Sequence, residues 1–219
     1  MKTIIAKLSL VAMGILVCRD ARAVVLYEIL SGPTVSASST QNVHADVSSA
    51  TGYSRGAGLN PAGASSTFNS TAFDSGNTSF ADAIADSEVI TWSFTLSQAY
   101  DLDSFSIRYD KSATGPSNLQ LSLDTGAGFV SVLTDAAVSD TAEEALLVDL
   151  SAFDGITGGT FRYAGFGATS AGGTFDFENT ANINSHSFQL NATVAIPEPS
   201  TLVLLGIGLM GFVAVRRWG

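Results

Sequence analysis

Strict alternation of apolar and polar residues in the middle of the chain is the feature that most restricts its fold. From Val89 to Leu96, every second residue is large and apolar and the residues between are hydroxylated. The apolar set is Ile90, Trp92, Phe94 and Leu96, and the hydroxylated set is Thr91, Ser93 and Thr95. Because successive side chains of a strand point to opposite faces, the pattern predicts a β-strand with one buried face.

Similar segments follow at short intervals, separated by turn residues. Further strands are expected at 102–109, 119–123, 129–133, 145–150, 160–166, 173–178 and 187–194. Residues 140–144 fit one short helical turn, and residues 31–80 are expected to be rich in loops with short strands. Many short strands without a long helix predict an all-β fold, a two-sheet antiparallel sandwich of the jelly-roll kind.

The first 23 residues have the pattern of a signal peptide. Lys2 and Lys7 precede the apolar part, and Ala21 and Ala23 are the small residues that a signal peptidase requires before its cleavage site. We therefore expect an N-terminal signal helix at 1–23 that is removed by signal peptidase. A lipid-modified Cys18 is the alternative interpretation of this segment.

The C-terminal segment, 196–219, begins with a stiff stalk. Pro197 and Pro199 have a fixed φ and no N–H, and each pushes the preceding residue toward an extended conformation. Glu198 between them therefore cannot be helical. The foldable part of the chain ends before this stalk, which gives an exported β-sandwich domain at 24–195.

An uncharged apolar run follows the stalk at 201–215, where we expect a transmembrane helix. At about 1.5 Å per residue the run spans roughly 22 Å, less than the hydrocarbon core of about 30 Å. Arg216 and Arg217 form the membrane stop and mark the cytoplasmic side. The body of the chain then lies outside the inner membrane, and the short span favours transient anchoring.

The order of these parts resembles a known sorting signal. Ile196-Pro197-Glu198-Pro199-Ser200-Thr201-Leu202, the Gly-rich apolar run and the terminal Arg pair are similar to the PEP-CTERM motif of Gram-negative bacteria, also called the ice-binding-protein C-terminal motif. The resemblance covers about a tenth of the chain. It departs from the family at the end, where Trp218-Gly219 follows two arginines in place of a longer basic cluster.

The resemblance implies specific partners and a destination. The Pro-Glu-Pro tripeptide would be recognised by an exosortase, a membrane-embedded cysteine-type transpeptidase that cuts near the motif and releases or transfers the exported part. The protein would then end at the cell surface or outside the cell. A plain C-terminal anchor behind a Pro-rich linker is the alternative interpretation.

The charge of the body excludes some partners. Residues 24–196 contain four basic and 18 acidic residues, a formal charge of −14. Nucleic acids and anionic membrane surfaces are therefore not expected to bind it. The body contains no cysteine, so no disulfide can form and packing must stabilise the fold.

A second resemblance concerns this body. Residues 104–124 and 161–177 are similar to the galactose-binding-like or carbohydrate-binding-module-like sandwiches found ahead of this sorting tail. This resemblance implies the sandwich fold more than any ligand. Extracellular polysaccharide is a candidate partner because the resemblance of the tail implies it. Trp92, with Tyr53, Tyr100, Tyr109 and Tyr163, would be the candidate sugar-stacking platform, although its place on the apolar phase of a strand favours the core.

The residues that could carry catalysis have simpler explanations. His44 and His186 have no metal-ligand spacing around them, and no G-x-S-x-G elbow is present. Hydrolysis could use one of two carboxylate pairs, but surface solvation explains both pairs in a chain this acidic. The pairs are Asp101 with Asp103 and Glu143 with Glu144. We expect no catalytic residues and no enzyme activity.

Calcium is the one ion that the sequence makes a candidate. It binds carboxylate and carbonyl oxygens in loops. Four acidic residues lie at expected strand ends, namely Asp110, Asp124, Asp154 and Glu178. No repeat or EF-hand signature joins them, so no metal ligand is assigned and no cofactor is expected.

Three hypotheses for function follow. The first is a non-enzymatic exported surface or extracellular-matrix protein, sorted by an exosortase-type system and linked to exopolysaccharide and biofilm. The second is a protein of the carbohydrate-binding-module kind, with or without calcium. The third is a secreted hydrolase of glycans or esters.

Overall fold

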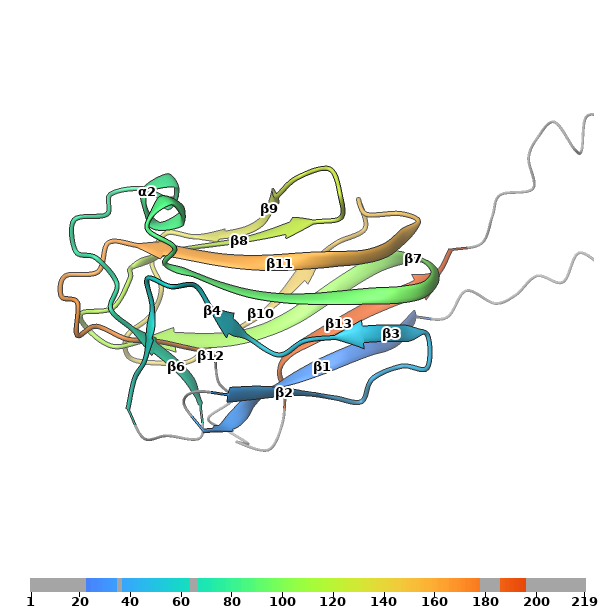
Figure 1. Cartoon of the computed structure of the whole chain (residues 1–219), viewed down its shortest axis with the longest axis horizontal. Coiled ribbons are helices and arrows are strands. Elements are labelled where there is room, and N and C mark those ends of the chain that lie inside the picture. Colours follow the sequence, from blue (N-terminus) through green and yellow to red (C-terminus); the bar gives the residue numbers. More distant parts are fainter. Residues whose placement is uncertain (1–22, 35–36, 64–66, 178–185, 196–219) are drawn as a thin grey trace, which may run out of the picture. The chain divides into compact units, whose positions relative to one another are not determined.

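The computed structural model describes residues 23–34, 37–63, 67–177 and 186–195, drawn in colour in Figure 1. They belong to one unit, 23–195. The first strands are β1 (Ala23–Thr34), β2 (Ala37–Gln41), β3 (Val47–Ala50), β4 (Ser54–Arg55), β5 (Asn60–Pro61) and β6 (Phe68–Thr71). After helix α2 (Phe80–Ala85) come β7 (Val89–Lys111), β8 (Asn118–Asp124), β9 (Val130–Asp135), β10 (Glu144–Asp149), β11 (Ile156–Phe166), β12 (Phe175–Phe177) and β13 (His186–Val194).

Strand β7 is shared by the two layers of the fold because it turns back at its middle (Figure 1). Its first part, from Val89 to Thr95, pairs with β11, while its second part, from Tyr100 to Ile107, pairs with β13. Residues 97 and 98, at the turn, are exposed. One half of this long strand therefore belongs to each layer.

The remaining strands add to either side of these two halves, and every pairing is antiparallel. The first layer contains β9, β8, β11 and the first half of β7, with β3 and β4 on its other edge. The second contains β2, β1, β13, the second half of β7 and β10. Short strand β12 joins the end of β7 to β6. This arrangement confirms the predicted all-β, two-sheet antiparallel sandwich.

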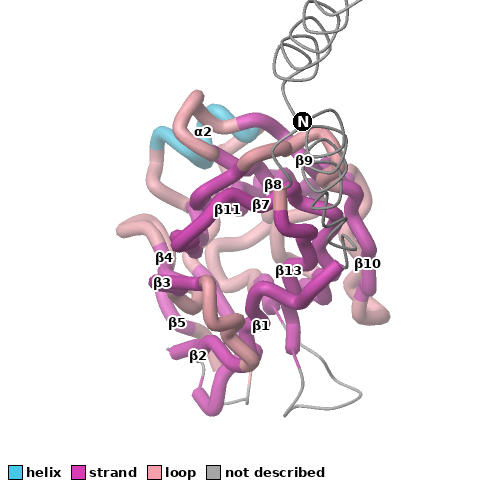
Figure 2. Tube along the Cα trace, turned by 90° about the vertical axis from the view of Figure 1, so that its right-hand side faces the viewer, coloured by secondary structure: helices cyan, strands magenta, loops and turns pink. Residues whose placement is uncertain are grey.

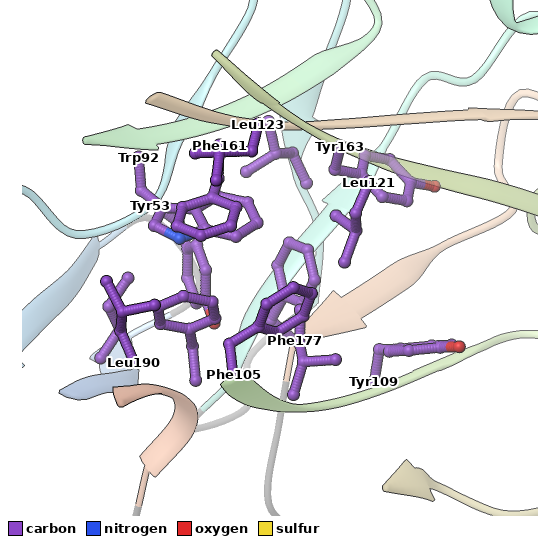
Figure 3. Packing of buried hydrophobic residues seen from close by; sticks show 14 of the residues in the cluster. Tyr53, Trp92, Phe105, Tyr109, Leu121, Leu123, Phe161, Tyr163, Phe177 and Leu190 are labelled. Atoms are coloured by element: carbon purple, nitrogen blue, oxygen red, sulfur yellow. The ribbon is translucent and has the colours of Figure 1, made fainter. Parts of the chain in front are cut away.

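Aromatic rings from both layers fill the space between them (Figure 3). Phe161 of β11 stacks on Trp92 of β7 at 5.4 Å between ring centroids. It also meets Phe105 and Phe188 of the second layer at 5.5 and 5.1 Å. Such ring pairs contribute about 0.5–1.5 kcal/mol beyond the area they bury. In the absence of disulfides, these contacts hold the layers together.

The alternating segments of the sequence form the strands expected of them. Ile90, Trp92, Phe94 and Leu96 are buried, as predicted from their spacing. The described residues of 31–79 form the end of β1 and the short strands β2 to β6, joined by loops. Phe68 and Phe73 of this segment are fully buried and anchor it to the core.

The expected helical turn at 140–144 is wrong. The backbone at 140–142 bends without forming a helix, and β10 begins at Glu144. Local side-chain bonds satisfy the backbone instead, because the hydroxyl of Ser139 accepts from the amides of Thr141 and Ala142. The carboxylate of Glu144 accepts from the amide of Ser139 at 3.0 Å.

The short helix α2, by contrast, was not expected from the sequence. Ser79 is its N-cap and accepts from the amide of Asp82 at 3.2 Å, an arrangement that stabilises a first turn. Phe80 lies edge-on to Phe166 at 4.8 Å, which places the helix beside β11 in Figures 1 and 2. The Ser-x-x-Asp spacing was the available signal for this helix.

The first test of the fold concerns Phe161, the ring shared by both layers. Phe161→Ala is expected to lower the free energy of unfolding by about 3–5 kcal/mol, since it leaves a cavity between the layers. Urea unfolding of the full chain followed by circular dichroism measures the loss. Leu147→Ala is the matched control, because Leu147 is 73% exposed and its truncation should cost about 0.5 kcal/mol or less. Equal losses for the two variants would contradict this account of the core.

Candidate functional site

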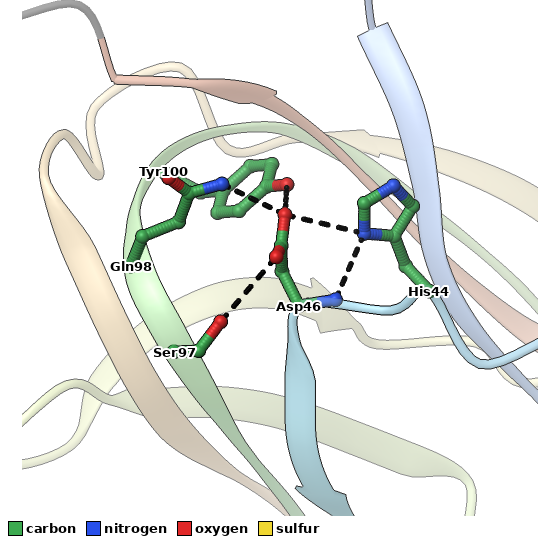
Figure 4. Close-up of polar contacts among 5 residues, drawn as sticks. All are labelled: His44, Asp46, Ser97, Gln98 and Tyr100. Carbon is green, nitrogen blue, oxygen red and sulfur yellow. Dashed lines mark hydrogen bonds and ion pairs between the residues drawn. The ribbon is translucent and has the colours of Figure 1, made fainter.

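A polar cluster around Asp46 lies where β7 turns back (Figure 4). One carboxylate oxygen of Asp46 accepts from the hydroxyl of Tyr100 and from the amide of Gln98, each at 2.7 Å. Its other oxygen accepts from the hydroxyl of Ser97 at 3.4 Å. The backbone carbonyl of Asp46 accepts from the Ser97 amide as well, so one residue before β3 binds the whole turn of β7.

His44 completes the cluster from the same loop. Its Nδ1 accepts from the backbone amide of Asp46 at 3.2 Å and lies 3.6 Å from the Asp46 carboxylate. Its ring meets the edge of Tyr100 at 6.2 Å.

The hydrogen bonds of the cluster alter two pKa values. The Tyr100 hydroxyl, followed by the Gln98 amide, lowers the pKa of Asp46, because donors stabilise the ionised carboxylate. Burial raises the pKa of Tyr100, and the hydrogen bond that it donates to Asp46 raises it further. The cluster therefore holds an ionised Asp46 and a neutral Tyr100 across the neutral pH range.

The contacts of the cluster fasten the loop before β3 to the turn of β7, and we call Asp46 with its partners Ser97, Gln98 and Tyr100 the clip. In a nucleophilic triad, histidine stands between the hydroxyl and the carboxylate, so that it can remove the hydroxyl proton. Here Ser97 contacts Asp46 directly, and Asp46 stands between Ser97 and His44. The three residue types of a triad are present, but their order in space is that of a clip.

The second histidine lies beside a buried carboxylate. Nδ1 of His186 is 3.4 Å from Oε1 of Glu28, whose residue is 7% exposed. The same oxygen accepts from Gln189 at 2.7 Å, and the other oxygen accepts from Asn42. Glu28 thus connects β1, β13 and the β2–β3 loop. Each of the two histidines lies beside a carboxylate that has a structural role.

The two candidate carboxylate pairs are bound in the same structural way. Asp101 accepts from the amide of Gly155 at 2.7 Å, and Asp103 accepts from the Thr193 hydroxyl at 2.8 Å. The second pair is separated by its partners. Glu143 binds Arg108 at 2.5 Å, and Glu144 binds the Ser139 amide. Each described carboxylate of these pairs fixes a neighbouring strand or turn.

The structure does not bring the candidate calcium ligands together. In the described ranges, no group of three or more His, Cys, Asp or Glu residues is placed to hold a metal ion. Asp124 accepts from the amides of Gly126 and Gly128, and Asp110 faces Asp176 across β7 and β12. Glu178 lies outside the described residues.

Burial of the aromatic residues confirms the core position that the alternation favoured for Trp92, and it rules out the alternative of a sugar-stacking platform. Trp92, Tyr100, Tyr109 and Tyr163 are at most 1% exposed, and Tyr53 is 6% exposed. Tyr53 instead stacks on Phe177 at 4.4 Å inside the core. Figure 3 shows Trp92, Tyr53 and Tyr163 among the packed side chains. These rings stabilise the sandwich and cannot stack on a sugar.

The sorting residues stand apart from the described domain. Pro197, Glu198, Pro199, Arg216, Arg217 and Ala21 lie outside the described residues, while Ala23 is the first residue of β1. The expected helices at 1–23 and 201–215 also lie outside them, apart from Ala23. Among the residues that the structure describes, no helix is long and apolar enough to cross a membrane.

Comparison with known families identifies the C-terminal segment. Residues 195–217 match the model of the PEP-CTERM protein-sorting motif, so the chain carries this motif. The motif implies export, anchoring through the C-terminus and processing by an exosortase. No curated protein matches the sequence.

Comparison with solved structures finds similarity at low sequence identity. A family 29 carbohydrate-binding module is 12% identical, with a TM-score of 0.35 over 83% of this chain and 97% of that chain. A CBM29-2 variant in complex with mannohexaose is 11% identical, with a TM-score of 0.34 over 80% of this chain and 94% of that chain. At this level of similarity neither structure assigns a ligand or a binding site to this chain.

The clip at Asp46 gives a prediction about pH. Tyr100→Phe should raise the pKa of Asp46 toward its ordinary value of about 3.9, because the strongest donor to the carboxylate is lost. A depressed folded-state pKa stabilises the protein above the unfolded pKa, and this stabilisation disappears as the pH falls through the folded pKa. Tyr100→Phe should therefore reduce the difference in stability between pH 6 and about pH 2.

Carboxyl-carbon NMR titration of Asp46 measures the shift directly. Ser97→Ala is the control, because its hydroxyl is the more distant donor at 3.4 Å and its loss should move the pKa less. An Asp46 pKa that is the same in the wild type and in Tyr100→Phe would rule out this description of the clip.

Proposed function

We propose that the chain is a non-enzymatic exported protein of the cell surface or extracellular matrix. It is delivered through its PEP-CTERM motif and is linked to extracellular polysaccharide and biofilm. The single observation that supports this function is the sorting motif at 195–217, placed directly after the last strand of the sandwich.

The proposed route has three steps. Signal peptidase removes residues 1–23 after export. The helix at 201–215 then holds the chain transiently in the inner membrane, with Arg216 and Arg217 on the cytoplasmic side. An exosortase-type transpeptidase recognises Pro197, Glu198 and Pro199 and cuts nearby, which frees or transfers the domain at 24–195.

The properties of the body support a structural or binding role. Its formal charge of −14 keeps it soluble and separates it from anionic surfaces. Its stability derives from an aromatic core without disulfides or a metal cluster among the described residues. The histidines and the candidate carboxylates are bound to neighbouring strands and loops, which supports a role other than catalysis.

The motif gives the test of this function. Replacing Pro197 and Pro199 by alanine is expected to abolish processing, because the stiff extended stalk is lost. In a Gram-negative host with an exosortase, the variant should stay in the membrane fraction with an intact C-terminus. Mass spectrometry of the C-terminus and cell fractionation measure both effects.

Ala195→Ser is the matched control, because it changes a neighbouring residue and leaves the tripeptide intact. It should be processed like the wild type. Unchanged processing and destination in the double-proline variant would disprove the proposed sorting route.

A further inference from the structure

The outer face of the first layer is covered by uncharged hydroxyl side chains. We call this surface the hydroxyl face and define it by two rows that cross the strands. In the first row Arg162 lies between Thr91 and Ser122, with Ser54 and Ser131 beyond them. Ser122 itself is buried at 4% exposure, so the accessible hydroxyls of this row are those of Ser54, Thr91 and Ser131. In the second row Thr160 lies between Ser93 and Asp124.

The alternation of the strands fixes the direction of these side chains. Trp92 and Phe94 of β7 and Phe161 and Tyr163 of β11 point into the core. Their neighbours in the two rows therefore point outward. The face thus presents hydroxyl groups, which both donate and accept hydrogen bonds, from four strands: β4, β7, β11 and β9.

An exposed aromatic ring and an arginine lie together on this face. The guanidinium carbon of Arg162 is 3.8 Å from the centroid of the Phe129 ring. Phe129 is 38% exposed and the adjacent Val130 is 55% exposed, so both belong to the small group of large apolar residues that the described domain leaves open. The Arg162 guanidinium makes no hydrogen bond within the described residues; it contacts the Phe129 ring and feels the charge of Asp124, so its N–H groups can donate to a ligand.

The turn between β8 and β9 holds the ring in this position. Oδ1 of Asp124 accepts from the amides of Gly126 and Gly128 at 2.7 and 2.9 Å. Both glycines have a positive φ, 110° and 100°, which side chains of L-residues rarely adopt. The Asp124 carboxylate therefore stabilises the turn that places the Phe129 ring against the guanidinium of Arg162.

Charge is distributed unequally between the two outer faces. In the two rows of the hydroxyl face, Asp124 and Arg162 are the only charged residues and have opposite signs. The second layer instead carries the acidic Asp103 and Asp149 on its strands, while its Arg108 is paired with Glu143. A polycation would be attracted to that layer, while a polyanion would be repelled by the body as a whole. A neutral, hydroxyl-rich partner suits the hydroxyl face.

We propose that the hydroxyl face binds a neutral polysaccharide, with Phe129 and Arg162 as its central contact. The Phe129 ring packs against the C–H groups of a sugar, and the guanidinium of Arg162 donates hydrogen bonds to sugar oxygens. The surrounding Ser and Thr hydroxyls exchange hydrogen bonds with the hydroxyls along the chain. This inference rests on the proposed function, since it names the polysaccharide class that the exported domain would contact.

Affinity electrophoresis of the full chain tests the inference. The chain is kept in a polyoxyethylene detergent, which carries no sugar headgroup, and is run in native gels that contain hydroxyethylcellulose, galactomannan or dextran. At least one of these neutral polymers should retard it. The double variant Phe129→Ala and Arg162→Ala should weaken the apparent affinity about tenfold or more. A few central residues usually carry most of the binding energy of an interface, so their truncation costs more than that of surrounding residues.

Two controls keep the result interpretable. Leu147→Ala removes an even more exposed apolar side chain, at 73% against 38% for Phe129, from the second layer and should bind like the wild type. The thermal unfolding midpoint of the double variant should match the wild type, since neither side chain belongs to the buried core. If the double variant does not fold, Ser131→Ala on the same face, with an exposed side chain, should still weaken binding measurably.

A further gel that contains alginate, a polyanion, serves as the charged comparison. Three outcomes would overturn the inference: no retardation by any neutral polymer, equal retardation of wild type and double variant, or retardation by alginate alone. None of them affects the sorting route, which is measured separately by processing and destination. A chain that is sorted normally but passes freely through all three neutral gels would therefore disprove the hydroxyl face and leave the proposed function intact.

Discussion

The pairing of β7 with partners in both layers is the constraint on which the rest of the structure depends. Its first half pairs with β11 and its second half with β13, so the turn between them sets the position of one sheet against the other. Asp46 binds this turn through Ser97, Gln98 and Tyr100. Because β7 belongs to both layers, it fixes their separation, and the aromatic side chains fill the space between them. The sandwich therefore closes without a disulfide.

The strands that could be predicted from the sequence are those with regular alternation. Ile90 to Leu96 alternates without interruption and forms the buried face of β7. β1 was missed because its pairing with β13 shifts between Val25 and Tyr27, so Leu26 and Tyr27 are both buried and the alternation is lost. Local hydrogen bonds at Ser139 likewise replaced the helical turn that the composition of 140–144 favoured.

The candidate sites depended on contacts between distant segments, which a single sequence does not reveal. Asp46 meets Tyr100 across 54 positions of the chain, and Phe129 meets Arg162 across two strands. The sequence indicated that aromatic residues might serve a sugar, but alternation placed Trp92 in the core and a glycine-shaped turn placed Phe129 outside. The sorting motif needed no such contacts, because its residues are consecutive and their order alone was sufficient to predict it.

The pairing of the first strand with the last has a consequence for the timing of folding. Val24 pairs with Ala192, and β13 stands between β1 and the second half of β7. On the proposed export route, the second layer therefore cannot be completed until residue 194 has crossed the membrane, although residues 24–177 cross earlier. The strand that closes the domain directly precedes the sorting motif at 195–217. The domain can therefore complete its fold only at the stage of translocation at which the sorting motif reaches the membrane.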